Sequence, residues 1–200
     1  TWLREVLRMR AQTHGADHPY AALDLGNIID NLNMAGRRTE ALALLDAAPT
    51  FRESVGDGAS HPQRMKLRLD LKRSQVHVDG GDAEAALARF PHALLREPAD
   101  LPDALPVLGQ ILCSRGEPRQ GLPHLAAALQ ALREGGEAEH SPWIGRIHGL
   151  MAECALRAGR RQAALQSAQL AARVFEGQKP FSPFFRAPWL RVQDALARRG

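Results

Sequence analysis

Apolar residues recur along this chain at helical spacing, in pairs of segments separated by a glycine. The first of these pairs covers residues 25–45, with Gly36 at its centre. Its apolar positions follow the i, i+3, i+4, i+7 pattern of one helix face: Leu25, Ile28, Ile29 and Leu32 before the glycine, and Ala41, Leu45 and Ala48 after it. Glycine suits a helix C-terminus. The pattern predicts two amphipathic helices joined in a hairpin, which needs neighbours to bury its apolar faces.

The same paired pattern returns three more times, which indicates an internal repeat. The predicted units cover 19–54, 62–96, 101–134 and 141–176, and a half-unit at 1–13 precedes them. Their turn glycines are Gly36, Gly80, Gly116 and Gly159, at steps of 44, 36 and 43 residues. Apolar or small residues recur after the later turns: Ala86, Phe90 and Ala93, then Gly121, Leu125 and Ala128, then Ala164, Ala168 and Ala171. The small ones predict that the helices approach closely.

Two features of the pattern predict local departures. Pro106 should lie within the first turn or so of its helix, because a proline deeper in the helix costs about 3 kcal/mol. Lys72 and Arg73 occupy positions where the repeat expects apolar and small residues, beside a turn with one extra residue, Gly80-Gly81. That unit is therefore expected either to be distorted or to expose a cationic ridge.

The composition changes after Phe175. Residues 177–200 predict a proline- and aromatic-rich connector followed by a last helix at about 189–198. One interpretation is that the aromatic residues cover the end of the last repeat, as terminal units of repeat arrays require. The other is a self-association patch at 181–189. We favour the cap.

These stretches together resemble the tetratricopeptide repeat, in the variety of about 42 residues found in kinesin light chains and bacterial signalling proteins. The resemblance rests on four stretches: Gly15-Ala16-Asp17-His18-Pro19, Leu25-Gly26-Asn27-Ile28, Gly36 with Ala41, and Leu108-Gly109 with Leu112. It covers residues 1–176. It implies an all-α fold, a right-handed superhelical solenoid of about four hairpins with flanking half-units, and residues 177–200 as connector and capping helix.

Composition and charge add little that is specific. Hydrophobic residues make up 44% of the 200 residues, and no apolar run reaches the length of a membrane span. The N-terminus carries charges and is no signal peptide, and it starts in mid-pattern without Met, so we expect a piece of a longer protein. The net charge of +4 comes mostly from scattered arginines. Solvated helix faces explain it better than a nucleic-acid or anionic-membrane surface.

Cysteine and histidine do not predict a catalytic or metal site. Cys113 and Cys154 lie in apolar helical patterns and are interpreted as buried small hydrophobes of a reducing, cytoplasmic compartment. A disulfide is possible, but their spacing does not require one. His18, His61 and His140 recur beside proline at the repeat period, which favours a structural role. No metal, phosphate-binding or nucleophile motif is present. We therefore expect no enzyme, no catalytic residue, no metal and no cofactor.

The resemblance implies a concave groove lined by the first helix of each unit. The family's groove positions lie ten, six, three and two residues before the turn glycine. On this chain they are Gly26, Asp30, Asn33 and Met34; Asp70, Ser74, His77 and Val78; Pro106, Gln110, Cys113 and Ser114; and Gly149, Glu153, Leu156 and Arg157. Asn27 is added as a hydrogen-bonding residue beside them.

This groove is mixed and somewhat acidic, through Asp30, Asp70 and Glu153. It lacks the Lys/Asn/Arg set with which some relatives hold a peptide's C-terminal carboxylate. An extended or helical segment with basic and apolar residues fits better, held by hydrogen bonds from Asn27, Asn33 and Gln110. The alternative is that Asp30 and Glu153 are ordinary solvated residues.

The resemblance therefore implies a protein-interaction module that docks a protein or peptide partner. In this family such arrays often form the regulatory or scaffold segment of a larger bacterial signalling protein, such as a serine/threonine kinase. We expect no small-molecule substrate, nucleic acid or membrane as partner. The alternatives are a nucleic-acid-binding or transcription-regulator-associated repeat domain, and a homo-oligomerisation module that uses residues 181–189.

Overall fold

The computed structural model describes residues 18–49, 62–176 and 182–198, with a few isolated positions before residue 18. Every regular element in these ranges is a helix, which confirms the all-α prediction. The helices are α2 (Pro19–Met34), α3 (Arg38–Asp46), α4 (Pro62–Asp79), α5 (Ala83–Arg89), α6 (Leu101–Ser114), α7 (Pro118–Glu134), α8 (Pro142–Arg157), α9 (Arg161–Glu176) and α10 (Pro183–Ala197), with 3-10 turns η2 (His92–Arg96) and η3 (Pro98–Asp100). None of these helices has the length and apolar character that a membrane crossing needs.

The chain forms two compact units, Thr1–Leu94 and Leu95–Gly200. Several predicted features lie outside the described residues: most of the half-unit at 1–13, His61, and the connector at 177–181 with Phe181. The division into a repeat array at 1–176 and a cap at 177–200 stays a prediction.

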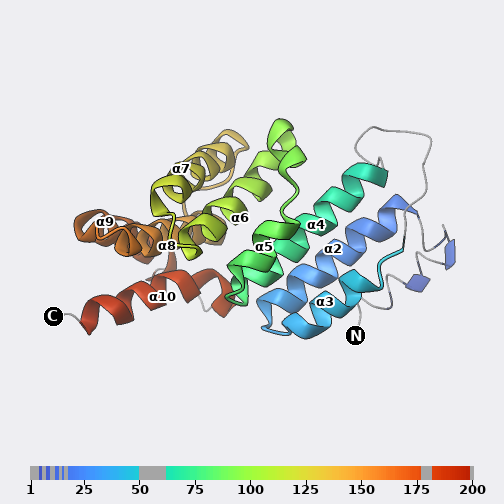
Figure 1. Ribbon diagram of the computed structural model, residues 1–200, viewed down its shortest axis with the longest axis horizontal. Coiled ribbons are helices and arrows are strands. Elements are labelled where there is room, and N and C mark those ends of the chain that lie inside the picture. The colour runs from blue at the N-terminus through green and yellow to red at the C-terminus, as the bar shows by residue number, and fades with distance from the viewer. Residues whose placement is uncertain are drawn as a thin grey trace. The chain divides into compact units, whose positions relative to one another are not determined.

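The first unit contains the hairpin α2–α3 and the helices α4 and α5 (Figure 1). Gly36 ends the α2 turn with a φ of +75°, a conformation that favours glycine. Helix α4 packs against both α2 and α3, and α5 packs against α4. The predicted apolar positions form the core of this unit: Leu25, Ile28, Ile29, Leu32, Ala41 and Leu45, together with Met65, Leu69 and Val76 of α4.

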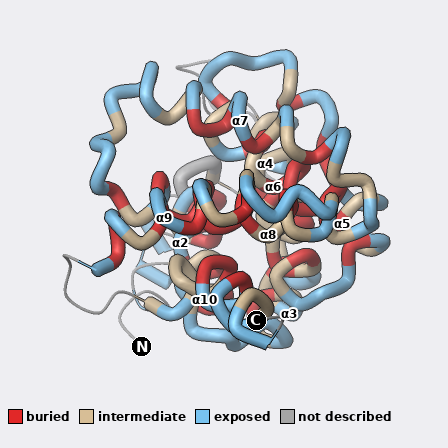
Figure 2. Tube along the Cα trace, turned by 90° about the vertical axis from the view of Figure 1, so that its left-hand side faces the viewer, coloured by how far each residue is buried: buried red, intermediate tan, exposed pale blue. Residues whose placement is uncertain are grey.

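The second unit contains two hairpins, α6–α7 and α8–α9, and the helix α10. Gly116 and Gly159 have positive φ at the two turns, as the sequence predicted. Helix α8 packs against α7 and α6, and α10 packs mainly against α8 with a smaller contact to α9. Helix α8 is therefore enclosed on several sides, and every residue from Ile144 to Leu150 is buried. Figure 2 shows the chain coloured by burial.

The predicted close approach of paired helices is confirmed. Ala41, Ala86, Ala128 and Ala164 are fully buried after their turns. The tightest crossing joins α6 and α7. A Cβ added at Gly121 would lie 2.7 Å from the carbonyl oxygen of Gly109, and one added at Gly109 would lie 2.7 Å from Cγ of Leu125. A side chain at either glycine would thus push the two helices apart.

The second hairpin differs from its prediction at both ends. Gly81, with a φ of +90°, is the left-handed residue of the turn, whereas the prediction counted from Gly80. The predicted second helix was to continue through Phe90 to Ala93, but α5 ends at Arg89 and Phe90 is extended. Pro91 explains this, because the residue before a proline disfavours helical backbone. The chain continues as the 3-10 turn η2.

Two further boundaries were predicted wrongly. Pro106 is the sixth residue of α6 and not part of its first turn, so the carbonyl of Pro102 receives no amide proton from position 106. Helix α10 begins at Pro183, six residues before the predicted start, because Ser182 caps it: the Ser182 hydroxyl accepts a hydrogen bond from the amide of Phe184. The aromatic segment is therefore largely helical.

The cationic ridge predicted as one outcome for the second hairpin is not formed. Nζ of Lys72 donates to Oδ2 of Asp30 at 2.6 Å, and Arg73 pairs with Asp46 at 2.5 Å. The Arg73 side chain is mostly buried. Lys72 and Arg73 are thus paired with acids of the preceding hairpin, which tie α4 to α2 and α3.

The two cysteines are joined, contrary to the interpretation as free buried thiols. A disulfide links Cys113 of α6 to Cys154 of α8, with the two Cα atoms 5.3 Å apart. The separation of 41 residues between the two cysteines did not indicate a disulfide, because such a bond depends on how α6 and α8 cross. The disulfide connects successive hairpins within the second unit.

Candidate partner-binding face of the first helices

The predicted groove residues lie on α2, α4, α6 and α8, at four positions before each turn glycine; we call these positions the first-helix face. In α4, counting from Gly81 moves the face by one residue. It then comprises Leu71, Gln75, Val78 and Asp79, which alternate buried and half-buried as Gly26, Asp30, Asn33 and Met34 do in α2. The predicted Asp70, Ser74 and His77 each lie one residue earlier. Asp70 pairs with Lys66 at 3.0 Å, and the Ser74 hydroxyl donates to the carbonyl of Asp70.

In the first unit the face is crossed by hydrogen bonds between α2 and α4. Oδ2 of Asp30 accepts a hydrogen bond from Nζ of Lys72. Nδ2 of Asn33 donates to Oδ2 of Asp79 at 2.8 Å, and Gln75 donates to the same oxygen at 2.8 Å. Oδ1 of Asn33 is buried and has no hydrogen-bond partner. The structure therefore places Asp30 and Asn33 against α4. Their partners there are Lys72 and Asp79, and Gln75 donates to Asp79.

Asn27 stays apart from this network. Its side chain is exposed, and its backbone carbonyl accepts a hydrogen bond from Nδ2 of Asn31 at 2.8 Å. Met34 and His77 are half-buried. The side-chain amide of Asn27 thus faces solvent, whereas that of Asn33 is already used inside the unit.

The second unit repeats the contact between successive first helices. Arg157 of α8 donates to the carbonyls of Cys113 and Ser114 of α6, at 3.4 Å each. In both units, a residue two positions before one turn glycine contacts a residue of the preceding hairpin that lies three positions before its own turn glycine. In the first unit these residues are Asp79 and Asn33, and in the second unit they are Arg157 and Cys113. Equivalent positions make equivalent contacts, although the chemistry differs.

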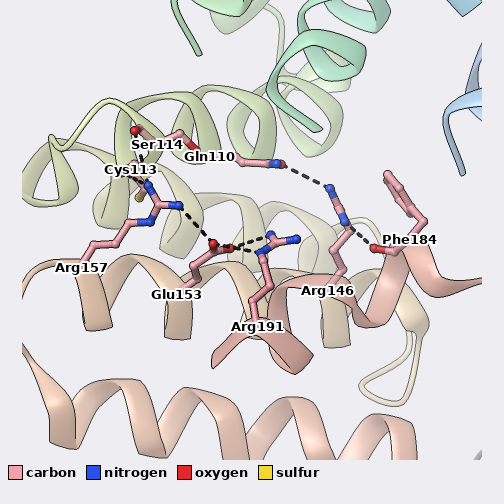
Figure 3. A network of polar contacts seen from close by, with 8 residues as sticks. All are labelled: Gln110, Cys113, Ser114, Arg146, Glu153, Arg157, Phe184 and Arg191. Carbon is pink, nitrogen blue, oxygen red and sulfur yellow. Dashed lines mark hydrogen bonds and ion pairs between the residues drawn. The ribbon is translucent and has the colours of Figure 1, made fainter. Parts of the chain in front are cut away.

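Helix α10 lies on the first-helix face of α8 (Figure 3). Glu153 of α8 stands between two arginines: Arg157, at 3.2 Å, and Arg191 of α10, whose two nitrogens lie 2.8 and 3.1 Å from the two carboxylate oxygens. A Cβ added at Gly149 would lie 3.0 Å from the backbone nitrogen of Trp189. Helix α10 therefore contacts α8 at two of its predicted groove positions, with its backbone at Gly149 and with the Arg191 side chain at Glu153.

Arg146 holds the start of α10. This arginine of α8 is buried. Its guanidinium donates to the carbonyl of Phe184 at 2.6 Å and to Oε1 of Gln110 at 3.3 Å, and it lies 3.7 Å from the centre of the Phe184 ring. A buried arginine so arranged combines hydrogen bonding with a cation–π contact. It links α6, α8 and α10, and it gives Gln110 an internal partner.

The aromatic residues of α10 pack within the second unit. Trp143 contacts both Phe184 and Phe185 edge to face, and Trp189 lies 5.7 Å from the ring of Phe175. Trp189 is buried, but Trp143 remains 45% exposed. The described part of 181–189 thus packs within the second unit, and both the cap and the self-association patch stay predictions.

Two titratable groups near α8, His148 and Glu139, have shifted pKa values. Burial lowers the pKa of His148, with a further contribution from Arg133, so its imidazole is neutral at neutral pH. The hydrogen bond from Arg133 lowers the pKa of Glu139. In the ranges that the structure describes, no three metal-ligating side chains lie together.

The residues that sequence reasoning missed are Arg146, Arg191, Lys72, Gln75 and Asp79. The doubled glycine at 80–81 could have indicated Gln75 and Asp79, since counting the groove positions from Gly81 and not from Gly80 selects both. Nothing in the repeat pattern marks Arg146 or Arg191, because their roles depend on where α10 packs.

Comparison of this chain with protein-family models, with curated proteins and with solved structures found no match.

Proposed function

We propose that this chain is a protein-interaction module built from tetratricopeptide-like hairpins, which stack as a right-handed superhelical solenoid. Its first-helix face docks a helical or extended segment that carries basic and apolar residues. No catalytic residue, metal or cofactor takes part in this function. The support is the recurrence of equivalent contacts between successive first helices, Asn33 with Asp79 and Cys113 with Arg157.

One observation carries the proposal for the ligand. Helix α10, which presents an arginine and apolar residues, lies on the first-helix face of α8 with Arg191 on Glu153. This is the chemistry that the acidic groove predicts for a partner, provided here by the chain itself. A nucleic-acid partner is supported less well, because Lys72, Arg73 and Arg191 pair with carboxylates inside the units.

The biological setting belongs to the same proposal. By its resemblance, the chain is a regulatory or scaffold segment of a larger bacterial signalling protein, for example a serine/threonine kinase. A cytoplasmic location is part of this expectation. The Cys113–Cys154 disulfide weighs against it, because structural disulfides persist mainly in oxidising compartments.

Selection from a random displayed-peptide library tests the proposed function. We expect immobilised wild-type chain to enrich peptides with arginine or lysine spaced among apolar residues. Asp30→Arg with Glu153→Arg should reduce capture of these peptides at least about tenfold, since like charges then oppose the ligand. The matched control is Glu134→Arg, an exposed glutamate on α7, which should leave capture unchanged.

Two results would contradict the proposal. One is selection of acidic peptides or of none. The other is tight binding of single- or double-stranded nucleic acid that weakens steeply with salt, which would indicate phosphate contacts. Helicity measured by circular dichroism must be equal in all variants for the comparison to count.

A further inference from the structure

We propose that the face of α8 covered by α10 is itself a partner-binding site, and that its external ligand is an amphipathic helix with the chemistry of α10. Such a helix carries a buried aromatic residue and, two positions later, an arginine for Glu153. The partner binds by replacing α10. This inference rests on the proposed function and specifies its ligand and its site.

The apolar part of the α10 contact is a regular stripe. Phe185, Trp189, Val192 and Leu196 follow one another at i, i+4, i+7 and i+11, the spacing of one helix face. They belong to the same apolar cluster as Ala152 and Leu156 of α8 and Phe175 of α9. Gly149 has no side chain and so lets α10 come close, since a Cβ there would meet Pro188 and Trp189 within 3.4 Å.

The polar part of the contact makes the site selective. Glu153 is 18% exposed in its side chain and receives two nitrogens of Arg191. The buried guanidinium of Arg146 donates to the carbonyl of Phe184, so a helix that replaces α10 must offer it a hydrogen-bond acceptor at that place. The site therefore favours a helix that places a carbonyl oxygen of its first turn against Arg146 and a cation of its third turn against Glu153.

The same geometry makes α10 replaceable. Its ion pair with Glu153 is half open to water, as the Arg191 side chain is 53% exposed, and such pairs contribute little net stability. Only six residues link Glu176 to Pro183, and a short tether gives an effective concentration of about a millimolar. An external helix therefore competes with a nearby segment of like chemistry, and loosening α10 exposes the site.

Binding of a labelled peptide of residues 182–198 to the full chain tests this. The proteins are wild type, an opened variant (Trp189→Ala with Arg191→Ala), and the opened variant with Gly149→Leu. We expect the opened variant to bind the peptide roughly a hundredfold more tightly than wild type, as the tethered competitor is lost. Gly149→Leu should abolish this binding, because its side chain occupies the path of the Trp189 backbone.

Exchanging the charges of residues 191 and 153 tests whether these two residues form the contact. A peptide with Arg191→Glu should bind the opened variant at least about tenfold more weakly, and adding Glu153→Arg to that variant should restore its binding. The control substitution Glu134→Arg should leave the binding of both peptides unchanged. If loss of the Trp189 ring unfolds α10's neighbours, a protease site in 177–181, cut before the titration, opens the site without a core substitution.

The outcomes separate the two proposals. Equal peptide binding by wild type and opened chain, or no binding by a folded opened chain, would overturn the further inference. In that case, enrichment of basic–apolar peptides by the wild-type chain would still support the proposed function. A dimeric mass of the opened variant without peptide would assign the site to a second copy of this chain, and would also overturn the inference.

Discussion

Replacing Gly121 by valine should lower the free energy of unfolding by about 3 kcal/mol or more. The added Cβ would contact Sγ of Cys113 and would lie 2.7 Å from the carbonyl oxygen of Gly109 and 3.0 Å from the backbone nitrogen of Cys113. Two of these three neighbours are backbone atoms of a helix, which cannot move aside alone. Overpacking of this kind typically costs 1–3 kcal/mol, and a β-branched residue adds further volume.

The matched control is Gly26→Ala in α2, where a Cβ would meet nothing within 4 Å. Alanine has lower conformational entropy in the unfolded chain, so this variant should gain about 0.5–1 kcal/mol. Urea unfolding followed by circular dichroism measures both changes. Equal stability of wild type and Gly121→Val would show that α6 and α7 do not cross at this glycine.

Reduction of the Cys113–Cys154 disulfide should cost about 4 kcal/mol of unfolding free energy. The bond closes a loop of 41 residues in sequence, and the chain-entropy model gives this value for such a loop. Both cysteines are buried, so the reduced protein keeps two packed thiols and loses mainly the restriction on its unfolded chain. Unfolding by urea with and without a reducing agent measures the difference.

The variant Cys113→Ala with Cys154→Ala provides the control, since its stability should not respond to the reducing agent. Mass spectrometry after alkylation of the denatured, unreduced protein gives the direct test. Two alkylated cysteines in that experiment would contradict the disulfide. Because Sγ of Cys113 lies against Gly121, the effects of this variant and of Gly121→Val should not be additive.

The hairpins were predictable because their determinants are local. Apolar spacing and turn glycines indicate where α2, α6 and α8 form and end, and Gly36, Gly116 and Gly159 have the positive φ that was expected. Errors occurred where two local signals competed. At Pro91 the effect of proline on Phe90 outweighed the apolar period, and at Gly80-Gly81 either glycine could have ended the helix.

The candidate site was predictable only in part. The positions of Asp30, Asn33, Gln110 and Glu153 follow from the count along each first helix. Their partners do not, because Lys72, Arg146 and Arg191 reach them across 36 to 42 residues of sequence. The acidic groove stays a prediction, and each of its three acids already pairs with a cation of the same chain: Asp30 with Lys72, Asp70 with Lys66 and Glu153 with Arg191.

Hydrogen exchange of the α10 amides tests most directly the claim that the first-helix face of α8 receives a helix. We expect the backbone amides of α10 beyond its first turn to be protected in the wild-type chain, because α10 is docked on α8. Gly149→Leu should remove this protection and leave that of α6 and α7 intact. Unprotected α10 amides in the wild type, or protection unchanged by Gly149→Leu, would contradict the account.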